Sequence, residues 1–154
     1  MENISISAER FKDGETIPDI YTCKGKDISP TLSWKGIPVG TKSIALIMDD
    51  PDAPGGTFVH WVLYNVQPQT QKLPESMPFD KVLADGSIQG MTDFGRTGYG
   101  GPCPPPGKTH RYYFKIYALD SKITLVPGAS KKQLENEMSG HILAKGEIVG
   151  IYKR

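Results

Sequence analysis

The segment from Gly98 to Asp120 reads GYGGPCPPPGKTHRYYFKIYALD, and it places a loop rich in glycine and proline directly before a run of β-forming residues. The segment from Asp49 to Val66, DDPDAPGGTFVHWVLYNV, has the same order. In both, Asp, His or Tyr stands where the loop meets the strand. Because binding residues are commonly carried by loops on a rigid scaffold, this pattern predicts a preformed polar pocket.

Further strand-like runs, rich in β-branched and aromatic residues, lie between clusters of glycine and proline. With the two segments above, the expected strands cover residues 4–11, 32–34, 43–49, 59–66, 111–119 and 147–152. Since regular helices do not separate these runs, the pattern favours an antiparallel β-sandwich over a parallel α/β sheet. We therefore expect a single, mainly β domain over residues 1–154.

One segment has helical periodicity. Ser130 can cap a helix, with Gln133 reaching back as a capping box. Packing positions recur at helical spacing at Leu134, Met138, His141 and Ile142. The pattern predicts a helix over about residues 130–145, ended by Gly146. A second, short helix near residues 73–81 is an alternative, against which two prolines in that stretch count.

Charge and composition limit which partners and which cellular location can be expected. The 18 Lys and Arg nearly balance the 17 Asp and Glu, so no broad positive field favours nucleic acid. The N-terminus lacks the residue order of a secretory signal, and no window supplies the roughly 18 apolar residues of a membrane span. We expect a cytoplasmic protein without an integral membrane segment, in which Cys23 and Cys103 stay free thiols.

The segment that begins at Asp49 crowds three carboxylates, Asp49, Asp50 and Asp52, into a stretch that two prolines restrict. One interpretation is an acidic turn whose Asp side chains accept hydrogen bonds from nearby backbone, and the other is a functional carboxylate at Asp50. A divalent ion on Asp50, Asp52 and His60 is a third option. No H-x-H or H-x-x-x-H spacing supports it, so we predict no metal site.

The alternation of side chains along a strand predicts which residues share a face with His60. One face carries Phe58, His60, Val62 and Tyr64, and the other carries Val59, Trp61 and Leu63. His60 thus enters the strand beside apolar neighbours, which fits a structural histidine as well as a ligand-binding one. We expect Trp61 to support the structure.

The segment from Gly98 to Asp120 offers hydrogen-bond donors and aromatic or imidazole rings to a ligand. Gly100 and Gly101, followed by Pro102, leave backbone N–H groups free to approach an anion closely. The loop lacks the ending of a nucleotide-binding P-loop. In the strand that follows, alternation places His110 and Tyr112 together on a pocket face.

Alternation sends Arg111 to the opposite face of that strand. We interpret it as the structural partner of a buried carboxylate such as Asp52. Cys103 begins no helix that would favour a thiolate, so we predict no catalytic cysteine.

Together, DPDAP with the following HW and GGPCPPPGKTHRYYFKIYALD resemble the two signature regions of the phosphatidylethanolamine-binding, Raf kinase inhibitor-like family. The likeness extends over nearly the whole chain, to the short bacterial and archaeal branch, through YTCKGKDISPTLSW, GTKSIALIMDDPDAP and GHILAKGEIVGIYKR. It implies a Greek-key sandwich with a small cavity for phosphate, acetate, cacodylate or a phospholipid headgroup. The matching positions are Asp50, His60, Gly101, His110 and Tyr112.

The resemblance carries further expectations. It implies loops of the family's shape at Pro51 and Pro102, with cis peptides nearby, and a homodimer. Longer animal members continue into a C-terminal helical extension, so the cavity here should be more open or closed by a partner. Thr92 stands where the bacterial pattern has Asn, which puts a local turn in doubt.

Three functions follow from these observations. The first is binding of a small anion or phosphorylated headgroup by Asp50, His60, Gly100–Pro102, His110 and Tyr112, with no cofactor and no catalytic residue. The second is inhibition of a kinase or protease by protein contact. The third is a weak ester or phosphoester hydrolase that uses Asp50 and His60 as a base-orienting pair.

Overall fold

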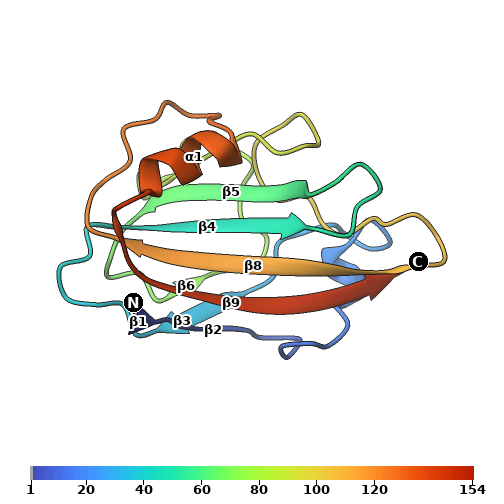
Figure 1. Cartoon of the computed structure of the whole chain (residues 1–154). Coiled ribbons are helices and arrows are strands. Elements are labelled where there is room, and N and C mark those ends of the chain that lie inside the picture. The colour runs from blue at the N-terminus through green and yellow to red at the C-terminus, as the bar shows by residue number, and fades with distance from the viewer. Residues whose placement is uncertain (1) are drawn as a thin grey trace.

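Two β-sheets enclose the core of the computed structural model, which describes residues 2–154 (Figure 1). The larger sheet contains, in spatial order, β1 (Glu2–Asn3), β9 (Ile142–Lys153), β8 (Thr109–Leu119), β4 (Ser43–Asp50), β5 (Phe58–Val66) and β7 (Ile88–Gln89). The smaller contains β2 (Ser5–Ala8), β3 (Leu32–Lys35) and β6 (Lys72–Leu73). Paired strands are antiparallel, except that β1 runs parallel to β9. The predicted mainly β sandwich is confirmed.

The central strand β4 is buried along all of its eight residues. Leu46 and Met48 belong to the core between the two sheets, whereas Ala45 and Ile47 belong to a second core on the outer face of the larger sheet. An apolar run without polar alternation is expected for a strand that is covered on both faces. The larger sheet is therefore the middle of three layers.

The third layer is helix α1 (Lys131–Met138), which lies over β4 and β5 (Figure 1). Both hydrogen bonds of the predicted capping box between Ser130 and Gln133 are present. Leu134 and Met138 are buried against the sheet. The start and the buried face of the helix are thus as the sequence predicts.

The predicted end of this helix is wrong. It stops at Met138, because Gly140 turns the chain with a φ of 81°, and β9 begins two residues later. Gly146 lies inside that strand. His141 is exposed instead of packed, with its Nδ1 2.7 Å from Asp120 Oδ1.

The stretch at residues 73–81 forms no helix. Leu73 ends β6, where it pairs with Leu32 of β3, and the chain then runs irregularly. Pro74 and Pro78 explain this, since proline disrupts a helix interior. The Gln89 side chain fixes the segment by donating to the carbonyl of Pro78 at 2.8 Å.

The free thiols predicted for the two cysteines are also wrong. Cys23 and Cys103 form a disulfide with their Cα atoms 5.4 Å apart, within the range that such a bond spans. The fold brings the turn after the 3-10 helix η1 (Asp19–Tyr21) against the loop before β8. All peptide bonds of residues 2–154 are trans, so the cis peptides expected near Pro51 and Pro102 do not occur.

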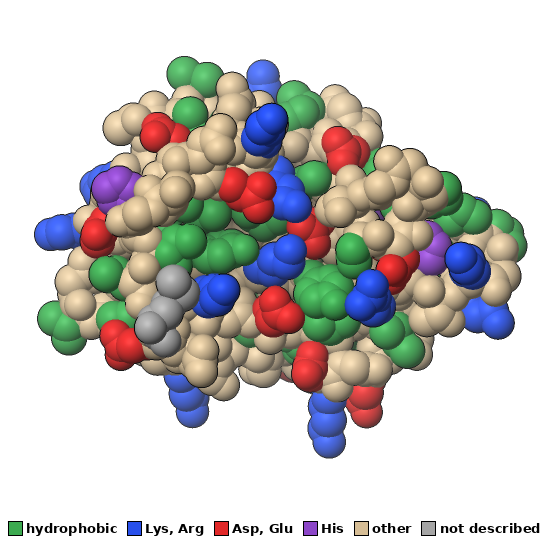
Figure 2. Space-filling model, viewed as in Figure 1, with side chains coloured by type: hydrophobic (Ala, Val, Ile, Leu, Met, Phe, Trp, Pro, Cys, Tyr) green, Lys and Arg blue, Asp and Glu red, His purple; other side chains and the backbone are tan. Residues whose placement is uncertain are grey.

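The surface carries both signs of charge. Lysine and acidic side chains are interspersed on the face of β8 and β9 that α1 leaves uncovered (Figure 2). No helix within residues 2–154 combines the length and the apolar character that crossing a bilayer requires.

The anchoring of α1 can be tested at Leu134, which is fully buried. We expect Leu134→Ala to lower the free energy of unfolding by about 2–5 kcal/mol, because it leaves a cavity beneath the helix. The exposed neighbour Asn136 provides the control, and Asn136→Ala should change stability by less than about 0.5 kcal/mol. Urea denaturation followed by circular dichroism measures both, and equal effects would contradict the packing described here.

Candidate functional site

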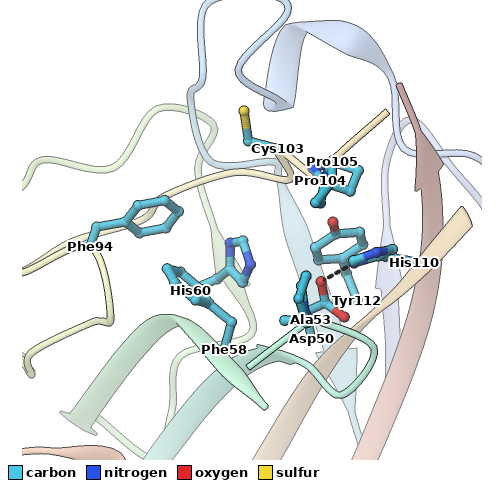
Figure 3. Close-up of a pocket in the computed structure, with 11 residues that line it drawn as sticks. Asp50, Ala53, Phe58, His60, Phe94, Cys103, Pro104, Pro105, His110 and Tyr112 are labelled. Atoms are coloured by element: carbon cyan, nitrogen blue, oxygen red, sulfur yellow. Dashed lines mark hydrogen bonds and ion pairs between the residues drawn. The ribbon is translucent and has the colours of Figure 1, made fainter. Parts of the chain in front are cut away.

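A cavity of about 200 Å³ lies where β4, β5 and β8 meet the loops at one end of the sandwich. Its polar lining residues are Asp50, His60, His110 and Tyr112 (Figure 3). The structure thus brings together four of the side chains predicted from the sequence. The apolar lining, which the sequence analysis did not predict, comprises Ala53, Pro54, Phe58, Phe94, Cys103, Pro104 and Pro105.

A β-bulge in β5 decides where His60 lies. Met48 of β4 pairs with Trp61, and the next residue of β4, Asp49, pairs with Val59. His60 is therefore the extra residue of the bulge. Such an insertion shifts the alternation of side chains by one position.

The shift places His60 and Trp61 on the same side of the sheet. The His60 ring meets the ring of Tyr112 edge to face, with centroids 5.2 Å apart, and Trp61 lies in the core between the sheets. Val62 and Tyr64 face the core beneath α1. The predicted shared face of His60, Val62 and Tyr64 is therefore wrong.

The hydrogen bond of His60 fixes its tautomer. Its Nδ1 lies 2.7 Å from the carbonyl oxygen of Gly100, and since a carbonyl only accepts, Nδ1 carries the hydrogen. Burial lowers the pKa of His60, which favours the neutral ring. In that ring Nε2 is an acceptor, and it has no hydrogen-bond partner within residues 2–154.

Asp50 orients the other histidine. Its Oδ2 lies 2.7 Å from Nδ1 of His110, and both side chains are buried. Its Oδ1 accepts from the backbone N–H of Asp52 at 2.7 Å. The sequence analysis paired Asp50 with His60, and the structure pairs it with His110 instead, because Gly100 occupies Nδ1 of His60.

Tyr112 supplies a hydroxyl. Burial raises the pKa of this phenol well above its ordinary value, and the nearby Asp50 carboxylate raises it further. The hydroxyl thus stays protonated near neutral pH and can donate a hydrogen bond.

Aromatic rings form the wall beside His60, across from Asp50, His110 and Tyr112 (Figure 3). The ring centroid of Phe58 lies 5.0 Å from that of His60 and 4.9 Å from that of Phe94. Phe94 comes from a turn in which the Thr92 hydroxyl donates to the carbonyl of Arg96 at 2.8 Å. Thr92 therefore stabilises the turn that the sequence analysis had placed in doubt.

The glycine loop does not line the cavity. Gly100 N–H donates to the carbonyl of His60 at 3.0 Å, and Gly101 N–H donates to Asp27 Oδ1 at 2.7 Å. These amides are thus bound within the protein and do not form the open anion cup expected from the sequence. A Cβ atom at Gly100 would overlap the ring of Phe94, so close packing explains the need for glycine.

Pro102 also acts within the protein. Its carbonyl accepts the backbone N–H of Cys23 at 3.1 Å. The next three residues along the loop, Cys103, Pro104 and Pro105, form the cavity wall in its place.

Arg111 has the partner predicted for it, and Trp61 has one that was not predicted. Arg111 makes a bidentate ion pair with Asp52, at 2.8 Å from Nη2 to Oδ1 and 2.9 Å from Nε to Oδ2. The pair is partly exposed, and not buried as the sequence analysis expected. Trp61 is buried and donates from Nε1 to Gln89 Oε1 at 2.7 Å. Within residues 2–154, no three His, Cys, Asp or Glu side chains cluster to hold a metal ion.

The Arg111 ion pair makes a prediction about pH. Its hydrogen bonds lower the pKa of Asp52 from 3.8 to about 2, so the stabilisation is complete above about pH 4 and is lost as the pH falls through 2. In Arg111→Met, we expect an NMR titration to return the pKa of Asp52 toward 3.8. Lys132→Met, at an exposed helix position, should leave it unchanged.

If the pKa of Asp52 stays near 2 without the guanidinium, the backbone and not Arg111 sets it. A lost affinity for cavity ligands in Arg111→Met, at unchanged stability, would contradict the purely structural role of Arg111.

Comparisons with known proteins agree with this architecture. The family model described as phosphatidylethanolamine-binding protein matches residues 7–153. The UPF0098 protein of Aquifex aeolicus is 54% identical over 153 residues, which cover 98% of this chain and 89% of that protein. The UPF0098 protein YbhB of Escherichia coli is 39% identical, over 92% of this chain and 95% of that protein.

Two crystal structures share the fold. A protein of Chlamydia trachomatis described as a homolog of phosphatidylethanolamine-binding protein superposes with a TM-score of 0.90 at 37% identity, over 100% of this chain and 99% of that one. Escherichia coli YbcL superposes with a TM-score of 0.91 at 34% identity, over 99% of both chains. The chain therefore belongs to the phosphatidylethanolamine-binding protein family.

Proposed function

We propose that this protein binds a small phosphate-bearing ligand, either a free phosphate or a phosphorylated headgroup, in the cavity lined by His60, His110 and Tyr112. The observation that carries the proposal is the free Nε2 of both imidazoles, whose Nδ1 atoms are held at 2.7 Å by Gly100 and Asp50. At about 200 Å³, the cavity is smaller than the roughly 300–1,000 Å³ of sites for drug-sized ligands. A compact ligand fits it best.

Proton position governs how such a ligand would be held. In a neutral ring with Nδ1–H, Nε2 accepts a hydrogen bond and meets the O–H of a protonated phosphate. A proton on Nε2 of His110 turns this acceptor into a charged donor, and the bond from Nδ1 to Asp50 stabilises the resulting cation. Tyr112 adds a donor. Among residues 2–154 the lining includes no lysine or arginine, so positive charge in the cavity has to come from histidine.

The aromatic wall supports a zwitterionic headgroup. Phe58 and Phe94 line the cavity beside His60, and ring faces attract an ammonium group. Asp50 lies at the opposite wall, where it holds Nδ1 of His110, so the ammonium is expected at the rings. A phosphoethanolamine-like ligand would satisfy both kinds of group, phosphate at the imidazoles and ammonium at the rings.

Hydrolysis is a second candidate, favoured by the Asp50–His110 pair. A carboxylate that holds Nδ1 leaves Nε2 as a base that can take a proton from water. Such an enzyme would turn over small esters or phosphoesters. Inhibition of a kinase or protease, a homodimer and a cytoplasmic location stay predictions from the sequence.

Binding can be measured by titration calorimetry with inorganic phosphate and phosphoethanolamine. We expect His60→Ala to weaken binding by about 10- to 100-fold, as for loss of a hydrogen bond to a charged group. His141→Ala is the matched control, because His141 is exposed and bonds to Asp120.

The same proteins should be assayed for turnover of nitrophenyl esters and phosphoesters. Turnover that disappears in Asp50→Asn would favour the enzyme over the binding protein. Equal affinity in wild type and His60→Ala would exclude the proposed site.

The pH dependence follows from the two histidines. Histidine is the side chain whose ordinary pKa lies closest to neutral pH. Burial lowers the pKa of His60, and the second imidazole, His110, faces Asp50 and Tyr112. We expect affinity to rise from about pH 8 to about pH 6. Glycerophosphoethanolamine is the suitable probe, since its phosphodiester keeps one negative charge over this range.

Calorimetry in two buffers of different ionisation enthalpy would measure the proton taken up on binding. His110→Asn, which removes one of the two imidazoles, should reduce both the uptake and the pH dependence. A flat affinity profile in the wild-type protein would refute the proton-coupled mechanism.

A further inference from the structure

One wall of the cavity is a loop without regular secondary structure. Cys103, Pro104 and Pro105 all line the cavity and lie in the irregular stretch that precedes β8. Asp50, His60, His110 and Tyr112, in contrast, come from strands that are fixed by their ladders. The shape of the cavity on this side therefore depends on whatever holds the loop.

The loop has little backbone bonding with which to hold itself. Four of the five residues from Pro102 to Pro106 are proline, which has no N–H donor. Its hydrogen bonds within residues 2–154 are made by carbonyls: Pro102 accepts from Cys23 N–H at 3.1 Å, and Pro104 accepts from Arg154 Nε at 2.7 Å. The disulfide from Cys103 is the covalent attachment of this wall.

The other end of the disulfide is firmly fixed. Cys23 follows η1, where Tyr21 is fully buried and donates its hydroxyl to Glu75 Oε2 at 2.5 Å. In the same turn, Asp19 Oδ1 accepts from the hydroxyl of Tyr152 at 2.7 Å. The disulfide thus ties a weakly held wall to an anchored turn 80 residues away in sequence.

Both cysteines are exposed, so a reductant in solution can reach the bond. Lys24 follows Cys23 directly in sequence and Lys26 lies three residues after it. Nearby cations favour the thiolate that leaves when a disulfide is attacked. The sulfur of Cys103 points away from His60 and His110 (Figure 3). Reduction would therefore release the wall without adding a thiol to the polar centre of the cavity.

From this arrangement we propose that the Cys23–Cys103 disulfide is a redox-sensitive lock on the cavity wall. A dithiol reductant attacks one sulfur and breaks the S–S bond through a mixed disulfide. Its second thiol then resolves this intermediate. Two electrons and two protons pass to the protein, which gains two thiols, while the reductant becomes a disulfide.

The effect on ligand affinity rests on the proposed function. A released wall must be ordered again when ligand binds, and this ordering opposes binding. We expect reduction to weaken phosphodiester binding by about 3- to 10-fold, as estimated from the cost of immobilising one side chain.

The experiment compares the oxidised protein, the protein reduced with dithiothreitol, and the double variant Cys23→Ser/Cys103→Ser. Hydrogen exchange of the Gly101 and Gly107 amides, which donate to Asp27 Oδ1 and to the carbonyl of Arg154, reports on the wall without any ligand. Calorimetry with glycerophosphoethanolamine reports on affinity. Reduction should accelerate exchange in the wall, leave β4 and β8 protected, and weaken binding, and reoxidation should reverse these changes. The double variant should match the reduced protein and ignore the reductant.

Four results would overturn the proposal: unchanged exchange in the wall, faster exchange with unchanged affinity, a disulfide that the dithiol cannot reduce in the folded protein, or unfolding of the whole chain on reduction. The two proposals fail separately. If the oxidised protein binds no phosphate ligand, the proposed function is lost, while faster exchange confined to the wall would still support the lock.

Discussion

The site depends on two buried carboxylates that end β4 and face opposite sides of the larger sheet. Asp49 is compensated by Lys131 at 2.8 Å and Lys115 at 3.2 Å, on the side of α1. Asp50 accepts a hydrogen bond on the cavity side from Nδ1 of His110 at 2.7 Å. An unpaired buried carboxylate costs several kcal/mol of folding free energy. Moving these partners away from β4 would therefore destabilise the fold. Asp49 thus fixes the start of the helix, and its neighbour Asp50 fixes the orientation of His110.

The bulge in β5 has a similar double effect. It turns His60 toward the cavity and also brings the residue against the glycine loop, where ring and backbone both bond to Gly100. The ring of Phe94 can pack against this position only because Gly100 has no Cβ. The bulge, the glycine and the aromatic wall therefore form one packed unit. This explains why a loop that looks like an anion cup serves to position a histidine.

Sequence patterns succeed here where the determining contacts are local. Alternation places His110 and Tyr112 together because β8 is regular between them, and Ser130 marks the helix start because its capping bonds span three residues. The face of His60 depends on pairing with another strand, so alternation within β5 misses it. The link from Cys103 to Cys23 spans 80 residues, and no periodicity bears on it.

The chemistry of the cavity follows from what lines it. An anion site built on arginine carries its charge at every pH in the physiological range. This cavity has imidazoles instead, each with one nitrogen already bonded within the protein. A proton on the ligand or on an imidazole would then match the charge of an anion held there. Because few strong contacts are available, the affinity for a ligand depends heavily on cavity walls that are ordered before the ligand binds. The cross-link at Cys103 matters because it orders one of these walls.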